Sequence, residues 1–83
     1  MENFNFKPLC MLATGRSARV IALAGGVQFR SRLSDMGLNV GSEVRVVSNG
    51  INAGPTLVAS GHARLALGNG TTKKILVVEN DYL

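Results

Sequence analysis

The sequence predicts a mainly β fold: a small β-barrel of five short strands, with one helix after the first strand. Ten glycines divide the 83 residues into segments of strand length. Hydrophobic residues make up 46% of the chain and charged residues 17%, which excludes a disordered tail and a coiled coil. The length excludes a second domain, so we expect residues 1–83 to form a single domain.

The first strand and the helix are predicted before residue 40. Residues 19–24 are rich in β-branched and aliphatic side chains, which is typical of a strand. Residues 28–35 are predicted to be helical because apolar side chains at helical spacing share one face: Phe29, Leu33 and Met36. Gly37 follows where a left-handed residue ends a helix, and Leu38 follows where a Schellman cap packs it against Leu33.

Four further strands are predicted after the helix, at residues 43–46, 56–59, 63–67 and 75–78. The first alternates polar and apolar residues and runs into an Asn49-Gly50 turn. The middle two are expected to form a hairpin around Ser60-Gly61-His62, and the last is the most aliphatic. Strands this short cannot build two packed sheets, so we expect an SH3-like barrel that removes exposed edges.

The charge is positive and unevenly distributed. Nine Lys and Arg oppose five Asp and Glu, which gives a net charge of +4 and a pI near 10. Three of the five acids lie near the ends of the chain: Glu2, Glu79 and Asp81. The interior is therefore more basic than the whole, and it predicts an anionic partner such as nucleic acid, a lipid headgroup or an acidic protein face.

The cysteine content and the N-terminus indicate a cytoplasmic protein. The single cysteine, Cys10, cannot form an internal disulfide, and its neighbours Leu9 and Met11 predict that it is a small core residue. The N-terminus lacks the basic segment of a signal peptide. Residues 46–63 carry no Asp, Glu, Lys or Arg, but Pro55 and three glycines favour strands and turns over a membrane span.

Catalysis is not predicted. One histidine, one cysteine and two interior acids cannot supply a Ser-His-Asp set or a carboxylate pair. His62 and Cys10 lie in no metal-ligand motif, so we expect no cofactor and at most weak binding of a divalent metal ion. Residues 68–74 lack the order of a phosphate-binding loop and are expected to form a basic turn.

A nucleic-acid-binding barrel is the main physical alternative. Eight cations could contact phosphates: Arg16, Arg19, Arg30, Arg32, Arg45, Arg64, Lys73 and Lys74. Single-strand readers, however, stack bases on aromatic side chains, and the predicted strands contain none. No helix-turn-helix is predicted either. Solvated faces of strands and helix explain these cations more simply, so nucleic acid is the weaker hypothesis.

A set of motifs occurs in a fixed order along the chain. The longest matches R-L-x-x-M-G-[LI]-x-x-G-x-x-V at Arg32, Leu33, Met36, Gly37, Leu38, Gly41 and Val44. It follows an L-x-x-L-x-x-G segment at residues 9–15. It precedes Gly54-Pro55, Gly61, R-L-A-L-G-x-G at residues 64–70 and K-I-x-V at residues 74–77. Together these resemble the FeoA family, small accessory proteins of ferrous-iron uptake, over a core of about residues 9–78.

The resemblance implies a non-catalytic SH3-like barrel that interacts with the cytoplasmic part of a FeoB-type ferrous-iron transporter. A basic surface would dock on an acidic face of that partner and hold the protein at the inner face of the membrane. We expect the partner-binding residues to be Arg30, Arg32, Gly54, Pro55, Gly61 and Arg64. We expect five residues of the longest motif to be structural: Leu33, Met36, Gly37, Leu38 and Gly41.

The chain departs from the family pattern at Thr72 and in lacking the acidic residues often found just before it, and one further hypothesis is open. Thr72 stands where the family usually has alanine, which affects what the surrounding loop can contact. The chain is also similar to the SH3-like domain of metal-dependent repressors, of which it would be a stand-alone relative. That domain normally follows a DNA-binding helix-turn-helix, for which we expect no room in this chain.

Overall fold

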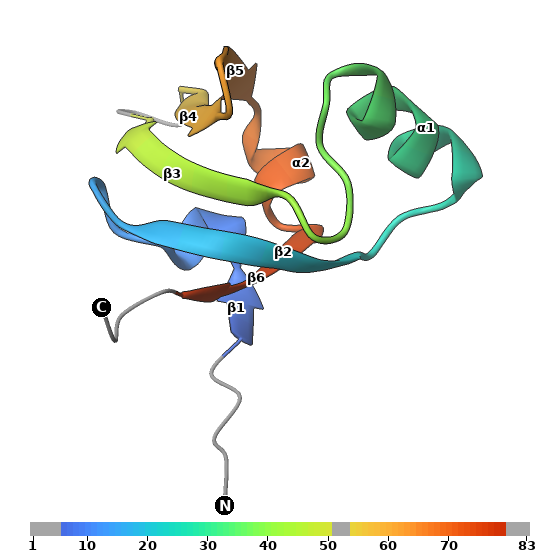
Figure 1. Cartoon of the computed structure of the whole chain (residues 1–83), viewed down its shortest axis with the longest axis horizontal. Coiled ribbons are helices and arrows are strands. Elements are labelled where there is room, and N and C mark those ends of the chain that lie inside the picture. The colour runs from blue at the N-terminus through green and yellow to red at the C-terminus, as the bar shows by residue number, and fades with distance from the viewer. Residues whose placement is uncertain (1–5, 51–53, 80–83) are drawn as a thin grey trace, which may run out of the picture.

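The computed structural model describes residues 6–50 and 54–79, which form one antiparallel sheet and short helices (Figure 1). The elements in chain order are β1 (Phe6–Pro8), the 3-10 helix η1 (Leu9–Met11), β2 (Ser17–Leu23), α1 (Val27–Asp35), β3 (Glu43–Ser48), β4 (Thr56–Ser60), β5 (Ala63–Leu67), α2 (Asn69–Thr72) and β6 (Ile75–Glu79). The mainly β class is confirmed, and all five predicted strands are present. The helix follows β2, which is the first strand predicted from the sequence.

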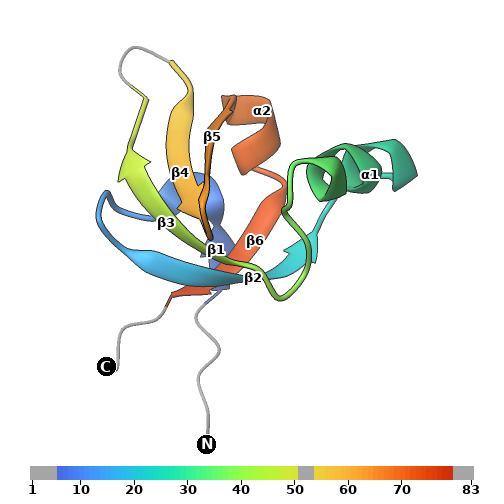
Figure 2. The ribbon, with the colours of Figure 1, turned by 45° about the horizontal axis from the view of Figure 1, so that its top comes forward.

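The sheet has the strand order β1-β6-β2-β3-β4-β5, and neighbouring strands are antiparallel. The register shifts between Val20 and Ala22 in β2 and between Val46 and Ser48 in β3. Such irregularities bend a strand, and the ribbon turned in Figure 2 shows β4 and β5 running across β2. The prediction that the barrel removes exposed edges is wrong. Two edges remain, because β1 and β5 end the sheet without pairing with each other.

The strand count of five is wrong, because β1 is a sixth strand. Phe6, Lys7 and Pro8 pair with Val78, Val77 and Leu76 of β6. A three-residue segment that contains proline carries no alternating pattern, and proline has no N–H to donate to a neighbouring strand. At the edge of a sheet a proline is tolerated, so the long-range pairing with β6 creates a strand that local pattern does not reveal.

Helix α1 ends at Asp35 as its sequence predicts and begins at Val27, one residue before the predicted start. No side chain caps its N-terminus at Gly26. At the other end the Leu38 N–H donates to the Leu33 carbonyl at 2.8 Å, and the Gly37 N–H donates to the Ser34 carbonyl at 2.9 Å. These two bonds form the predicted Schellman motif, and Gly37 adopts the left-handed φ of 89° that the motif requires.

The basic turn predicted at residues 68–74 is a short helix, α2. The Gly68 carbonyl accepts the N–H groups of Thr71 and Thr72 at 3.0 Å. Thr72 is fully buried, and its hydroxyl donates to the Asn69 carbonyl at 3.3 Å. The departure from the family pattern at Thr72 therefore lies inside the protein and offers no surface contact. Glycine and threonine are poor helix formers, so the sequence gives no helical signal here.

The core lies inside the bend of the sheet. It consists of aliphatic side chains from every strand except β1, from α1 and the segment after it, and from η1 with its flanks: Leu9, Leu12, Ala18, Val20, Leu33, Leu38, Val44, Val46, Val58, Leu67, Ile75 and Val77. The prediction that Cys10 is a core residue is wrong, because its side chain is exposed. A 3-10 helix repeats every three residues, so Leu9 and Leu12 face the core while Cys10 and Met11 face solvent.

Candidate protein-docking surface

Helix α1 presents two of the predicted contact residues to solvent. Arg30 and Arg32 are exposed, whereas Leu33 is buried and Phe29 and Met36 pack partly against the core. A helix this short forms only if it buries an apolar face, so the inner residues fix which way the arginines point. Arg32 lies in the last turn, where a positive charge is favoured by the negative end of the helix dipole.

Two contacts fix the position of α1. A Cβ at Gly25 would overlap the Phe29 ring, so glycine is what allows that ring to lie against the chain before the helix. The Lys74 ammonium lies 5.4 Å from the centroid of the same ring, within the range of a cation–π contact. The base of α1 is therefore held between the end of β2 and the start of β6, and Lys74 is occupied by this contact.

Gly41 ties the segment after α1 to β2. Its N–H donates to the Val20 carbonyl, and its carbonyl accepts a hydrogen bond from Arg19 Nη1, both at 2.8 Å. Leu38, just before it, is fully buried. The structure thus places both residues in the packing that joins α1 to the sheet.

Arg64 lies on the outer face of β5, at the opposite end of the sheet from β1. Arg45, Ala59 and Arg64 are neighbours across β3, β4 and β5. Two strand spacings of about 4.8 Å separate the backbones that carry the two arginines, with only a methyl group between them. A shallow hollow opens in this face beside Ser17, Arg45, Ala59 and Gly61. Both arginines add positive potential to one face.

The two predicted contact turns lie apart. Gly54 and Pro55 precede β4, and Gly61 follows it in the turn to β5, so the length of a five-residue strand separates them. In both ribbon views α1 also stands apart from the β4–β5 hairpin (Figures 1 and 2). The six predicted residues therefore do not converge on one pocket. They are distributed over α1 and the two ends of the hairpin.

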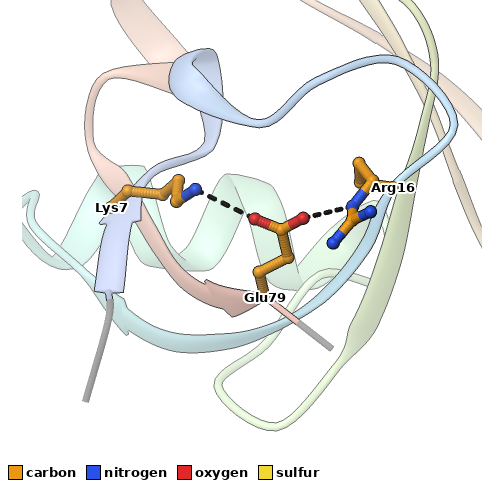
Figure 3. Close-up of polar contacts among 3 residues, drawn as sticks. All are labelled: Lys7, Arg16 and Glu79. Carbon is orange, nitrogen blue, oxygen red and sulfur yellow. Dashed lines mark hydrogen bonds and ion pairs between the residues drawn. The ribbon is translucent and has the colours of Figure 1, made fainter. Parts of the chain in front are cut away.

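Two other cations are bound within the protein by Glu79. Figure 3 shows the Lys7 ammonium and the Arg16 guanidinium on opposite sides of this carboxylate. The Lys7 Nζ to Glu79 Oε1 distance is 2.9 Å, and Arg16 Nε bonds Oε2. These hydrogen bonds, from Lys7 first and then Arg16, hold the pKa of Glu79 below its ordinary value. The cluster joins β1, the segment before β2 and the end of β6.

The three arginines predicted to contact a partner have no carboxylate of this kind beside them. Arg30, Arg32 and Arg64 are exposed, and within residues 6–50 and 54–79 their side chains make no hydrogen bond or ion pair. An arginine without an internal partner keeps its donors free for a carboxylate or phosphate of another molecule. The basic surface that can bind a partner is therefore narrower than the composition indicates: among the described residues it includes these arginines of α1 and β5, together with the exposed Arg45 of β3 and Lys73 after α2.

The described residues offer little other chemistry. Among them, no three or more His, Cys, Asp or Glu side chains come together as metal ligands would. His62 is exposed in the β4–β5 turn. No helix in the described ranges is long and apolar enough to cross a membrane.

Sequence reasoning missed two features of this surface. Glu79 is more than an acid near the end of the chain, because its carboxylate pairs with two cations whose distance from it in the sequence hides the pairing. Phe6 brings one aromatic side chain into the sheet, and it is 58% exposed. A single exposed ring is not the row of stacking platforms that single-stranded nucleic acid requires.

Comparison with known proteins connects this geometry to a family. The FeoA domain matches residues 7–79. A candidate Fe(2+) transport protein A from Methanocaldococcus jannaschii is 31% identical over 75 residues, which cover 90% of this chain and 89% of that protein. The crystal structure of an iron uptake regulatory protein, FeoA, superimposes with a TM-score of 0.83 and 28% identity and covers 90% of this chain and 99% of its own.

The fold is that of a further FeoA with a solved structure. Stenotrophomonas maltophilia FeoA, solved in complex with zinc and described as a prokaryotic SH3 domain protein, has a TM-score of 0.70 and 30% identity. The match covers 83% of this chain and 86% of that protein. The zinc belongs to that protein, and the described residues of this chain lack a cluster fitted to hold such an ion.

The fold of this chain is that of a small SH3-like barrel. The chain belongs to the FeoA family of ferrous-iron transport proteins, as its ordered motifs predict, and it is not an enzyme.

The resemblance to repressors extends only to the fold. A manganese-dependent transcriptional repressor superimposes with a TM-score of 0.85 over 96% of this chain, at 22% identity and over 45% of the repressor. Nearly the whole of this chain thus corresponds to less than half of the repressor. The shared fold transfers neither DNA binding nor metal sensing to this chain.

Proposed function

We propose that this protein supports ferrous-iron uptake by binding the cytoplasmic part of a FeoB-type transporter. In this role it is a non-catalytic accessory protein of the cytoplasm that reaches the inner face of the membrane through its partner. The observation that carries the proposal is the set of three exposed arginines without internal partners: Arg30, Arg32 and Arg64. Membership of the FeoA family supplies the context of ferrous-iron transport.

The charge of the surface suits such docking. Positive residues left without internal partners attract an acidic protein face and orient it, and this gives specificity and fast association. The flanking turns at Gly54-Pro55 and Gly61 provide backbone at the two ends of β4 that a partner can approach. Gly54, Pro55 and Gly61 therefore stay in the proposal as secondary contacts, after the arginines.

The direct test is co-purification with the full-length transporter in detergent, at low and at moderate salt. We expect association at low salt that weakens as salt rises, because exposed charges are screened. The variant R30E/R32E should lose association, whereas R30K/R32K, which keeps the charge, should retain most of it. R64E should weaken association more than K73E, a matched charge reversal elsewhere on the surface.

Two outcomes would overturn the proposal. One is the absence of association between the wild-type protein and the transporter at both salt concentrations. The other is a loss in R64E, K73E and R30E/R32E that depends only on the number of charges reversed, because net charge alone would then explain binding. Binding of single-stranded nucleic acid with a steep salt dependence would instead support the alternative function.

A further inference from the structure

The two edges of the sheet are protected to different degrees. Edge strands expose unpaired N–H and C=O groups, and proteins usually shorten or interrupt them or place lysine or proline there. β1 has three residues, including Pro8, and its Lys7 is bound by Glu79. β5 has five residues, pairs with β4 without a register shift, and contains neither proline nor lysine.

The free side of β5 has defined backbone groups. Ser60 and Ala63 pair next to the two-residue turn, and pairing continues through Arg64, Leu65, Ala66 and Leu67. In an antiparallel ladder, alternate residues direct both their N–H and C=O toward the partner strand, and the others direct them away. With the pair next to the turn bonded to β4, Arg64 and Ala66 direct their groups to the open side. Both are exposed, and within the described ranges β5 forms no backbone hydrogen bond beyond those to β4.

The side chains of β5 select what can occupy this edge. On the outer face, Arg64 has no internal partner, and Arg45 lies two strands away. On the inner face, Leu65 is only half-buried. A strand laid beside β5 would place alternate side chains next to Arg64 and next to Leu65. The matching segment therefore alternates acidic and apolar residues.

We propose that the open edge of β5 binds an extended acidic segment of the transporter's cytoplasmic part, which adds a seventh strand to the sheet. This inference rests on the proposed function and specifies how the partner is held. Backbone hydrogen bonds to Arg64 and Ala66 give affinity, the Arg64 guanidinium pairs with a carboxylate, and an apolar residue covers Leu65. A second copy of this chain is disfavoured as the occupant because it would bring another basic β5 beside the first.

The test uses the full chain and the full-length transporter in detergent. A66P removes the outward N–H without breaking a bond to β4, and A66S is its matched control because it keeps the N–H. We expect A66P to raise the dissociation constant at least about tenfold, A66S to leave it within about twofold, and R64E to raise it more than R64K does. On complex formation, hydrogen exchange at the Arg64 and Ala66 amides should slow, because strand addition covers them.

The outcomes separate this inference from the function itself. If the wild type binds the transporter and A66P, shown to be folded by circular dichroism, binds equally well, the edge inference fails and the function stands. Unchanged exchange at both amides in the complex would also overturn the inference, and this readout decides the question even if A66P does not fold. If the wild type does not bind, both fail. Sedimentation that shows a dimer abolished by R64E would assign the edge to a second copy and overturn the proposed occupant.

Discussion

The edge strands β1 and β5 end the same sheet in opposite ways. β1 is short, contains Pro8, and has its Lys7 bound to Glu79. β5 is longer and regular, and its Arg64 is exposed without a partner. Both edges are positively charged, so charge alone does not distinguish a structural region from a recognition surface. What distinguishes them is whether other groups of the same protein already pair with the charged side chain and the backbone N–H and C=O groups of the strand.

The largest effect is expected at the anchor of the β1 edge. Leu9 is fully buried directly after β1, whereas Met11, in the same helical turn, is 68% exposed. L9A should lower the free energy of unfolding by about 2–5 kcal/mol, because it removes core contacts and leaves a cavity. M11A is the matched control and should change it by less than about 0.5 kcal/mol. Urea unfolding followed by circular dichroism measures both, and similar losses would contradict the assignment of η1 as an anchor.

The next largest effect concerns the C-terminal cap of α1, the helix that carries two of the exposed arginines. G37A places a Cβ at φ 89° with no atom within 4 Å, so its cost is backbone strain alone, about 1–2 kcal/mol. G26A, at the other end of α1, also meets no atom but has a φ of −78°, so it should change stability little. Equal effects of the two variants on the urea midpoint would show that the cap of α1 contributes nothing.

The sequence predicts the structural features of the two regions that depend on local pattern. The cap at Gly37 and Leu38 and the β4–β5 turn at Gly61 follow from spacing and turn chemistry, and the structure contains them. β1 and α2 were missed because pairing with β6 and burial of Thr72 override weak local propensity.

The sequence predicts the net charge of the surface but not which of its charged side chains are paired. Composition predicts a basic surface, but Lys7 and Glu79 lie 72 residues apart, so no local pattern reveals which cations the fold neutralises. Arg64 is a candidate contact from its motif, yet its place on an open edge depends on the strand order. The distribution of the predicted contacts over α1 and both ends of β4 likewise follows only from the tertiary arrangement.

A smaller effect concerns the pH dependence of the β1 side. The Glu79 pKa is lowered by Lys7 and Arg16, so its stabilising contribution is complete above the pKa of the unfolded chain. That contribution is lost as the pH falls through the lower pKa of the folded state. E79Q should therefore be less stable than the wild type at pH 7, and the two urea midpoints should converge in acid. D35N removes an exposed acid at the end of α1 and should not lower stability. A gap between E79Q and the wild type that persists in acid would contradict this explanation.

The smallest effect compares one cation from each edge. K7Q breaks the contact with Glu79, whereas R64Q removes a side chain without an internal partner. R64Q should change the free energy of unfolding by less than about 0.5 kcal/mol, and K7Q should lower it by more than R64Q does. High salt should reduce the difference between the variants, since the Lys7–Glu79 pair is partly exposed and therefore screened. Equal destabilisation by the two variants at low salt would mean that Arg64 is also satisfied within the fold. The β5 edge would then lose the free charge that sets it apart from β1.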